Sequence, residues 1–153
     1  MAASDQERAE RSTAAMWASD NASKWFGMTI ESVGKGTATL TLTVEKHHTN
    51  GHDNCHGGVI FALADSAFAF ACNSGNEATV AQSNSITYVA PARSGDRLTA
   101  TAVEIVRRGR SGTYDVTVRR EDGTVIALFR GLARAVGGTL YDEASQQDGE
   151  TAS

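Results

Sequence analysis

The stretch that decides the fold is GVIFALADSAFAFACN, residues 58–73. Apolar side chains and alanines occupy nearly every side of a helix drawn through it, which predicts a long, central, buried helix. The small alanines would let a β-sheet approach that helix closely. Asp65 departs from the pattern, because a carboxylate in an apolar helix is costly unless it is paired, protonated or used in function. A structural Asp65 that caps backbone donors or faces an exposed stripe is the alternative.

Upstream, the sequence predicts one helix and then two strands. Ser4 and Glu7 form a capping-box pattern, and an alanine-rich segment continues the helix to about Lys24. From residue 28 the period changes, and threonines alternate with aliphatic residues over residues 37–44, as in a half-buried strand. The polar segment 45–57, with all four histidines, predicts a loop.

Downstream, four segments are rich in Val, Ile, Thr and Tyr: 79–89, 97–108, 113–121 and 124–136. Turn sequences at 109–112 and 122–123 predict hairpins, so we expect these strands to form a meander. Few helices and hairpin-linked strands predict an α+β fold with an antiparallel sheet. Such a sheet often pairs its free face or edge with a second copy, so we expect a homo-oligomer.

The bulk composition is that of one globular domain. We expect the domain to span residues 1–138 and the acidic, polar tail 139–153 to be disordered. The net charge of −4 argues against a general nucleic-acid binder. No apolar run is long enough to span a bilayer, and no signal-peptide pattern is visible, so we expect no membrane partner. Cys55 and Cys72 are expected to be reduced thiols in a cytoplasmic protein.

The start of the central helix, His56-Gly57-Gly58, could bind an oxyanion. Free N–H groups at a helix N-terminus attract negative charge, and glycines let a thioester carbonyl approach them. A glycine-rich entry to a packed helix is the bland alternative. Asp65 lies seven residues after Gly58, about 10 Å along a helix, whereas reacting groups must come within about 3.5 Å. We therefore expect a dimer with antiparallel central helices that combines Gly57 of one chain with Asp65 of the other.

The sequence gives weaker support for two other kinds of site, a zinc site and a cysteine nucleophile. The spacing of His48, His52 and His56 could bind zinc on a helix, but Asn50-Gly51 and Gly57-Gly58 interrupt any such helix, so no metal is expected. A Cys55–His56 nucleophile pair is disfavoured because neighbouring side chains of an extended chain point to opposite sides.

Positive charge gathers around one predicted hairpin. Its residues, Arg107, Arg108 and Arg110 followed by Ser111-Gly112, could hold the phosphates of a coenzyme A nucleotide. A solvated hairpin is the alternative.

These motifs resemble the PaaI group of hotdog-fold thioesterases, which act on phenylacetyl-CoA and related aryl-acyl thioesters. The matching segments are NGH at 50–52, CHGG at 55–58, FxLADxAFxxACN at 61–73, GDxLTA at 95–100, YD at 114–115 and ALFRG at 127–131. The resemblance covers about residues 15–138. It implies one long helix wrapped by an antiparallel sheet, in dimers that often pair into dimers of dimers, with no cofactor.

The resemblance also implies roles for particular residues. Asp65 would be the nucleophile or general base, the Gly57 N–H would bind the thioester oxygen, and His56 would position the thioester. A polar residue of the first helix completes the family site, and here either Ser19 or Asn21 could fill that position. The motif further implies substrate contacts by Asn50, Asn54 and Gly58.

The implied reaction is hydrolysis of phenylacetyl-CoA or hydroxyphenylacetyl-CoA in phenylacetate catabolism. A hotdog acyl-CoA dehydratase or hydratase, or a non-catalytic acyl-CoA-binding protein, is the alternative. A DNA-binding regulator should carry a basic reading module, which is not evident here.

Overall fold

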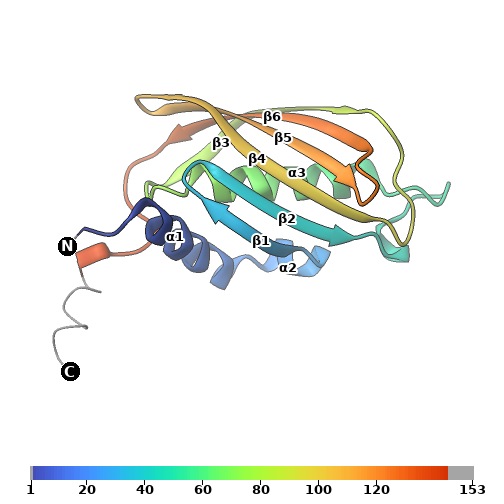
Figure 1. Ribbon diagram of the computed structural model, residues 1–153, viewed down its shortest axis with the longest axis horizontal. Helices are drawn as coiled ribbons and strands as arrows, with labels where there is room; N and C mark the ends of the chain where they lie inside the picture. Colours follow the sequence, from blue (N-terminus) through green and yellow to red (C-terminus); the bar gives the residue numbers. More distant parts are fainter. Residues whose placement is uncertain (1, 145–153) are drawn as a thin grey trace.

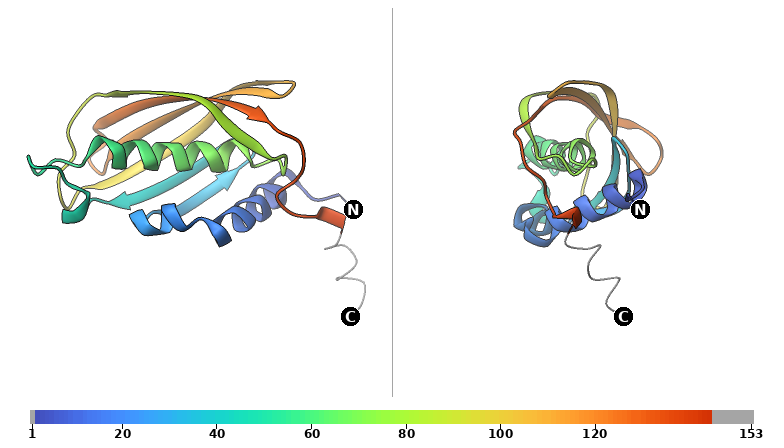
Figure 2. Two further views of the ribbon diagram at one scale, coloured as in Figure 1. Left: turned by 180° about the vertical axis from the view of Figure 1, so that it is seen from behind. Right: turned by 90° about the vertical axis from the view of Figure 1, so that its left-hand side faces the viewer.

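A computed structural model of the chain describes residues 2–144. Its elements in chain order are α1 (Asp5–Ser19), α2 (Asn21–Phe26), β1 (Thr29–Gly34), β2 (Thr37–Thr43), the 3₁₀ helix η1 (Lys46–His48), α3 (Gly57–Cys72), β3 (Thr79–Tyr88), β4 (Arg97–Arg108), β5 (Ser111–Arg120) and β6 (Val125–Ala135). One six-stranded antiparallel sheet curves around α3, while α1 and α2 lie beside β1 (Figures 1 and 2). The predicted α+β class is confirmed.

The core lies between α3 and the concave face of the sheet. Leu63, Ala64 and Ala67 of α3 are fully buried, and the small side chains let the strands approach the helix, as the sequence predicts. They approach closely at Gly131 of β6, where an added Cβ would lie 2.7 Å from the ring of Phe68. Helix and sheet are therefore packed too tightly at this point for any larger residue.

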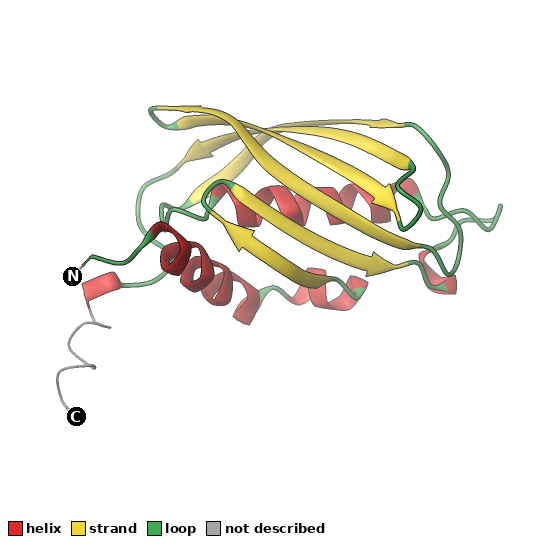
Figure 3. Cartoon of the chain, viewed as in Figure 1, coloured by secondary structure: helices red, strands yellow, loops and turns green. Residues whose placement is uncertain are grey.

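The strand order corrects the predicted meander. The sheet runs β1-β2-β4-β5-β6-β3, so β4, β5 and β6 form the meander while β3 pairs with β6 at the far edge. Residues 89–96, which include Pro91, carry the chain from β3 across to β4 (Figure 3). The crossing leaves β3 and β1 as the two edge strands.

The single predicted N-terminal helix is also corrected, because it is two helices. Asp20 ends α1 and caps α2, accepting hydrogen bonds from the Ser23 N–H at 2.9 Å and the Ser23 hydroxyl at 2.7 Å. An aspartate that caps a new helix interrupts the old one. Gly27, in the left-handed region at φ 86°, ends α2. The N-cap of α1 is Ser4, whose side chain accepts from the Glu7 N–H. The predicted capping box is only half present, because no described hydrogen bond runs from the Ser4 N–H to the Glu7 side chain.

The predicted tail begins with residues that contact the domain. Residues 139–144 are attached to the domain, because the Asn76 side chain accepts hydrogen bonds from the Leu140 and Tyr141 N–H groups. Glu143 also pairs with Arg8 at 2.9 Å. The rest of that predicted tail, 145–153, lies outside the described residues. Within residues 2–144, no helix is long and apolar enough to cross a membrane.

Candidate active site

The N-terminus of α3 presents an unused hydrogen-bond donor. No described residue accepts a hydrogen bond from the Gly57 N–H. His56 is the N-cap, and its Nδ1 accepts from the Gly58 N–H at 2.8 Å. A neutral His56 that accepts at Nδ1 carries its proton on Nε2. The Nε2–H is therefore a second donor at this site, beside the Gly57 N–H. This end of the helix therefore combines a free N–H with its positive dipole.

The loop before α3 is held in place by backbone hydrogen bonds. The His56 N–H donates to the His48 carbonyl at 2.8 Å, and the Cys55 N–H donates to the Ala92 carbonyl at 2.7 Å. Asn50 closes the loop, its Oδ1 accepting from the N–H groups of His52 and Asn54. Within one protomer Asn50 thus shapes the loop, and its predicted contact with substrate stays a prediction.

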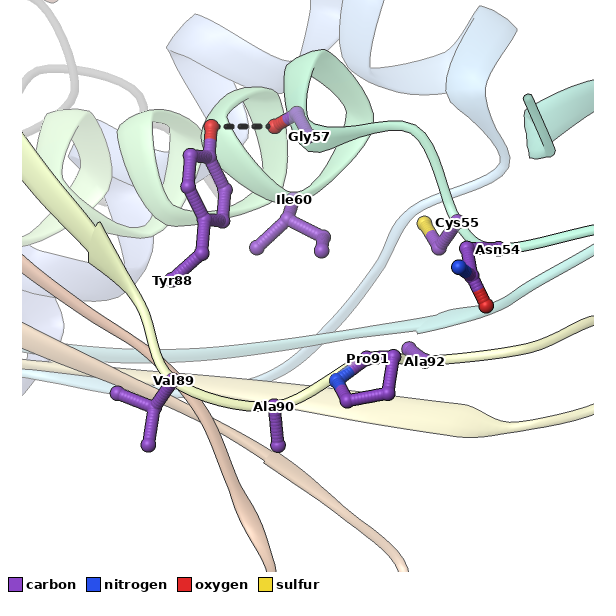
Figure 4. Close-up of a pocket in the computed structure, with 9 residues that line it drawn as sticks. All are labelled: Asn54, Cys55, Gly57, Ile60, Tyr88, Val89, Ala90, Pro91 and Ala92. Carbon is purple, nitrogen blue, oxygen red and sulfur yellow. Dashed lines mark hydrogen bonds between the residues drawn. The ribbon is translucent and has the colours of Figure 1, made fainter. Parts of the chain in front are cut away.

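A pocket of about 350 Å³ opens beside this loop, between the start of α3 and the segment after β3 (Figure 4). Its lining is mostly apolar: Asn54, Cys55, Gly57, Ile60, Tyr88, Val89, Ala90, Pro91 and Ala92. The Tyr88 hydroxyl donates to the Gly57 carbonyl at 2.8 Å. A Cβ on Gly57 would lie 3.1 Å from the Tyr88 ring, so a larger residue would require a small shift of that ring. The Oδ1 of Asn54 is buried and accepts no hydrogen bond from the described residues.

Asp65 lies half-buried in the middle of α3. The Asn84 side-chain N–H, from β3, donates to Asp65 Oδ1 at 3.0 Å. Burial raises the pKa of Asp65 above its ordinary value, and the hydrogen bond from Asn84 opposes that rise. The carboxylate is therefore a stronger base than an exposed aspartate, although it is paired on one side only.

A chain of hydroxyl groups joins α2 to the residue after Asp65. The Ser23 and Ser66 hydroxyls are 2.8 Å apart, and Ser23 is held by Asp20. The predicted first-helix candidates lie elsewhere: Ser19 and Asn21 are both exposed, and neither is hydrogen-bonded to Asp65. Ser19 lines a separate hollow near Thr139 and Leu140. Ser23, which the sequence reasoning missed, is a residue of α2 whose hydroxyl is hydrogen-bonded to α3 beside Asp65.

The arginine hairpin lies at the opposite end of α3 from Gly57. Arg107 donates to the Cys72 carbonyl at 3.1 Å and to Glu77 at 3.1 Å, so it caps the C-terminus of α3. Arg108, Arg110 and Ser111 are exposed, and Gly112 is buried against the Tyr114 ring. Because α3 has 16 residues and is about 24 Å long, the arginine hairpin lies far from the Gly57 N–H of the same chain. The predicted role of these residues in holding the phosphates of coenzyme A stays a prediction.

The rings of His47 and His48 lie in contact, with their centroids 4.0 Å apart. His48 is buried with its Nδ1 accepting from the Glu45 N–H at 3.0 Å. Among residues 2–144, no three His, Cys, Asp or Glu side chains are grouped so that they could hold a metal ion. Burial raises the pKa of the Cys55 thiol to about 11, so this thiol is protonated near neutrality and is a poor nucleophile.

The geometry assembles two half-sites in each protomer. One is the Gly57 N–H with His56 and the apolar pocket, and the other is Asp65 with Asn84. The donor suits a developing oxyanion, and the carboxylate suits attack or proton abstraction. The sequence reasoning missed Tyr88, Asn84 and Ser23. Asp20 three residues before Ser23 is a capping signal for α2, whereas nothing local marks Asn84 or Tyr88.

Comparisons with known proteins agree with this geometry. The sequence model of the thioesterase superfamily matches residues 52–127. The chain is 42% identical over 130 residues to acyl-coenzyme A thioesterase PaaI of Escherichia coli (strain K12), covering 85% of this chain and 93% of that protein. It is 30% identical to human acyl-coenzyme A thioesterase 13, covering 67% and 76%. The solved structure of the E. coli PaaI protein from the phenylacetic acid degradation operon superposes with a TM-score of 0.87 at 40% identity, covering 89% and 99%.

Proposed function

Because this chain belongs to the PaaI-type acyl-CoA thioesterases of the thioesterase superfamily, we propose that it hydrolyses phenylacetyl-CoA or hydroxyphenylacetyl-CoA to the free acid and coenzyme A. The observation that carries the proposal is the Gly57 N–H, which has no acceptor among the described residues and borders a mostly apolar pocket. Ile60, Tyr88 and Val89 offer the kind of wall that an aromatic acyl group favours. We assign the reaction to phenylacetate catabolism. We place the protein in the cytoplasm, where the free thiols of Cys55 and Cys72 would stay reduced.

The reaction divides between the two half-sites. The thioester carbonyl oxygen accepts from the Gly57 N–H, where the helix dipole stabilises the oxyanion, and His56 donates from Nε2 to position the thioester. Asp65 either attacks the carbonyl carbon or takes a proton from the water that attacks it. The C–S bond then breaks and coenzyme A leaves as a thiolate, which needs little acid assistance. In the nucleophilic route, one water then hydrolyses the acyl-enzyme anhydride, which releases the acid and restores the Asp65 carboxylate.

The site is proposed to be complete only in a dimer, with Gly57 of one chain facing Asp65 of the other. Two features support this. Gly57 and Asp65 are separated by more than two turns of the rigid α3, and β3 is an edge strand with an exposed, partly apolar surface that includes Val80, Tyr88 and the adjacent Val89. An unpaired edge of this kind is suited to pairing with a second copy. Two such dimers would then associate into a tetramer, a dimer of dimers.

The decisive experiment measures thiol release from a panel of aryl- and alkyl-acyl-CoA substrates by the wild type and Asp65→Asn. We expect aryl-acetyl thioesters to be preferred and the variant to lose about 10²–10⁴-fold in kcat. A variant with full activity would remove Asp65 from the mechanism. Absence of thiol release from every aryl-acyl-CoA by the wild type would contradict the proposed function.

The same assay separates the two roles of Asp65. A single turnover in water enriched in heavy oxygen would place label in the Asp65 carboxylate only if an acyl-enzyme anhydride forms and is hydrolysed at its enzyme carbonyl. Label confined to the released acid is the result expected for the general-base route.

A further inference from the structure

Asn84 is the residue of β3 that reaches the Asp65 carboxylate. Its half-buried side chain lies where β3 pairs with Gly131 of β6, a neighbour without a side chain. An ionised carboxylate only accepts hydrogen bonds, so the amide must present its N–H group to it, as the 3.0 Å contact with Asp65 Oδ1 shows. No described residue donates a hydrogen bond to the other oxygen, Oδ2. The two oxygens of Asp65 are therefore unequal.

The rest of the Asn84 amide is not satisfied by the protomer. Its Oδ1 is buried and accepts no hydrogen bond from the described residues. A buried amide that is paired on one side only is a poor contributor to stability, and such groups occur where function requires them. A leucine of similar size would fill the same space without an unpaired oxygen. The amide is therefore better explained by its contact with Asp65 than by packing.

We propose that Asn84 is a positioning residue of this thioesterase, which anchors Asp65 through Oδ1 and so leaves Oδ2 as the reacting oxygen. The inference rests on the proposed function. Oδ2 either forms the bond to the thioester carbonyl carbon or accepts the proton of the water whose oxygen forms that bond. In both routes the electron pair of the broken C–S bond leaves on the coenzyme A sulfur, and in both the carboxylate must keep one orientation.

Among residues 2–144, no side chain other than that of Asn84 is hydrogen-bonded to the Asp65 carboxylate. Ser66 adjoins Asp65 in the sequence, but its hydroxyl is engaged with Ser23 at 2.8 Å. The nearest comparable residue on the same strand is Gln82, which is exposed and makes no hydrogen bond to Asp65. Gln82→Leu is therefore a matched control, since it also removes a side-chain amide from β3.

The test compares Asn84→Leu, Asn84→Asp and Gln82→Leu in the assay of acyl-CoA hydrolysis. Loss of one hydrogen bond to a charged group should lower kcat about 10- to 100-fold in Asn84→Leu, with KM changed less than about twofold, since Asn84 acts on the transition state rather than on substrate binding. In Asn84→Asp a second carboxylate faces Asp65, so the acid limb of the kcat profile should move to higher pH. Gln82→Leu should keep the wild-type profile.

A double variant distinguishes positioning from a structural role. In the Asp65→Asn background, Asn84→Leu should cause no further loss of kcat, because Asn84 acts only through Asp65. Thermal unfolding of Asn84→Leu should show no loss of stability that could explain the slower rate. Provided that the wild type is active, either of two results overturns the positioning role. One is a wild-type kcat in Asn84→Leu. The other is an equal loss of kcat on adding Asn84→Leu to the wild type and to Asp65→Asn. An inactive wild type overturns the proposed function itself.

Discussion

At the scale of single residues, the chemistry depends on how Asp65 is held. Its carboxylate is half-buried, paired by Asn84 on one oxygen, and has a raised pKa because burial disfavours its charge. A raised carboxyl pKa in the folded state means that the folded protein binds more protons than the unfolded chain between the two pKa values. Stability therefore falls as pH rises through this window, and the full cost is present above the folded pKa.

The first prediction is that Asp65→Asn stabilises the protein at neutral pH while abolishing most of its activity. The amide is nearly isosteric with the carboxylate but carries no charge to desolvate. Thermal unfolding should show a higher Tm for the variant at pH 7, and the difference should shrink as pH is lowered below the folded pKa of Asp65. An unchanged or lower Tm at pH 7 would contradict the burial cost assigned to this carboxylate.

The kcat of the wild type should fall on the acid side for the same reason. Only the ionised Asp65 can attack or accept a proton, so the rate is lost as pH falls through its folded pKa, which lies above that of an exposed aspartate. A pH–rate profile checks this expectation. An acid limb at or below the ordinary carboxyl range, near 3.9, would exclude it.

At the scale of elements, α3 depends on its N-cap. His56 Nδ1 accepts from the Gly58 N–H, and removal of an N-cap acceptor costs about 1 kcal/mol. We therefore expect His56→Ala to be less stable by this amount, whereas His56→Asn should remain close to the wild type because asparagine is a good N-cap. Both variants lack the Nε2 donor, so both should hydrolyse acyl-CoA slowly. Equal stabilities measured by chemical denaturation would argue against the capping role.

The contact between α3 and β6 gives a prediction about stability alone. A Cβ at Gly131 would lie 2.7 Å from the buried Phe68 ring, so Gly131→Ala should destabilise the fold by about 1–3 kcal/mol through overpacking. Gly75→Ala is the matched control, because nothing lies within 4 Å of an added Cβ there. Denaturant midpoints of the two variants provide the comparison. Similar midpoints would mean that the sheet can yield at β6.

At the scale of the whole molecule, the prediction concerns sharing of the site between two chains. His56→Asn and Asp65→Asn should each be slow, but subunits exchanged between them should recover activity. Half of the randomly formed dimers would contain both chains, and each of these would have one intact site of two. The expected recovery is about a quarter of the wild-type rate.

The control for this experiment is the same pair of proteins mixed without subunit exchange, which should remain slow. A lack of recovery after confirmed exchange would place Gly57 and Asp65 of one chain in the same site.

Much of the fold could be predicted from the sequence because its signals are local. The apolar run of residues 58–73 predicts α3, alternation predicts β2, and turn residues predict the hairpins β4–β5 and β5–β6. The break at Asp20 is local too, since Asp20 caps Ser23, but the alanine-rich segment on its N-terminal side concealed it. The motif residues His56, Gly57 and Asp65 were identified from the sequence, and the structure places them at the start and middle of α3.

The tertiary structure alone decided the contacts between segments that are distant in the sequence. The pairing of β3 with β6 joins residues from 39 (Tyr88 and Ala127) to 56 (Thr79 and Ala135) positions apart, and no turn between them specifies it. That pairing brings β3 alongside α3, and only then do Asn84 and Tyr88 meet Asp65 and Gly57. The sequence by itself determined which residues could do chemistry, since residue type and helix position are local properties. Which partners hold them was decided by packing, because contacts between distant segments depend on the whole sheet.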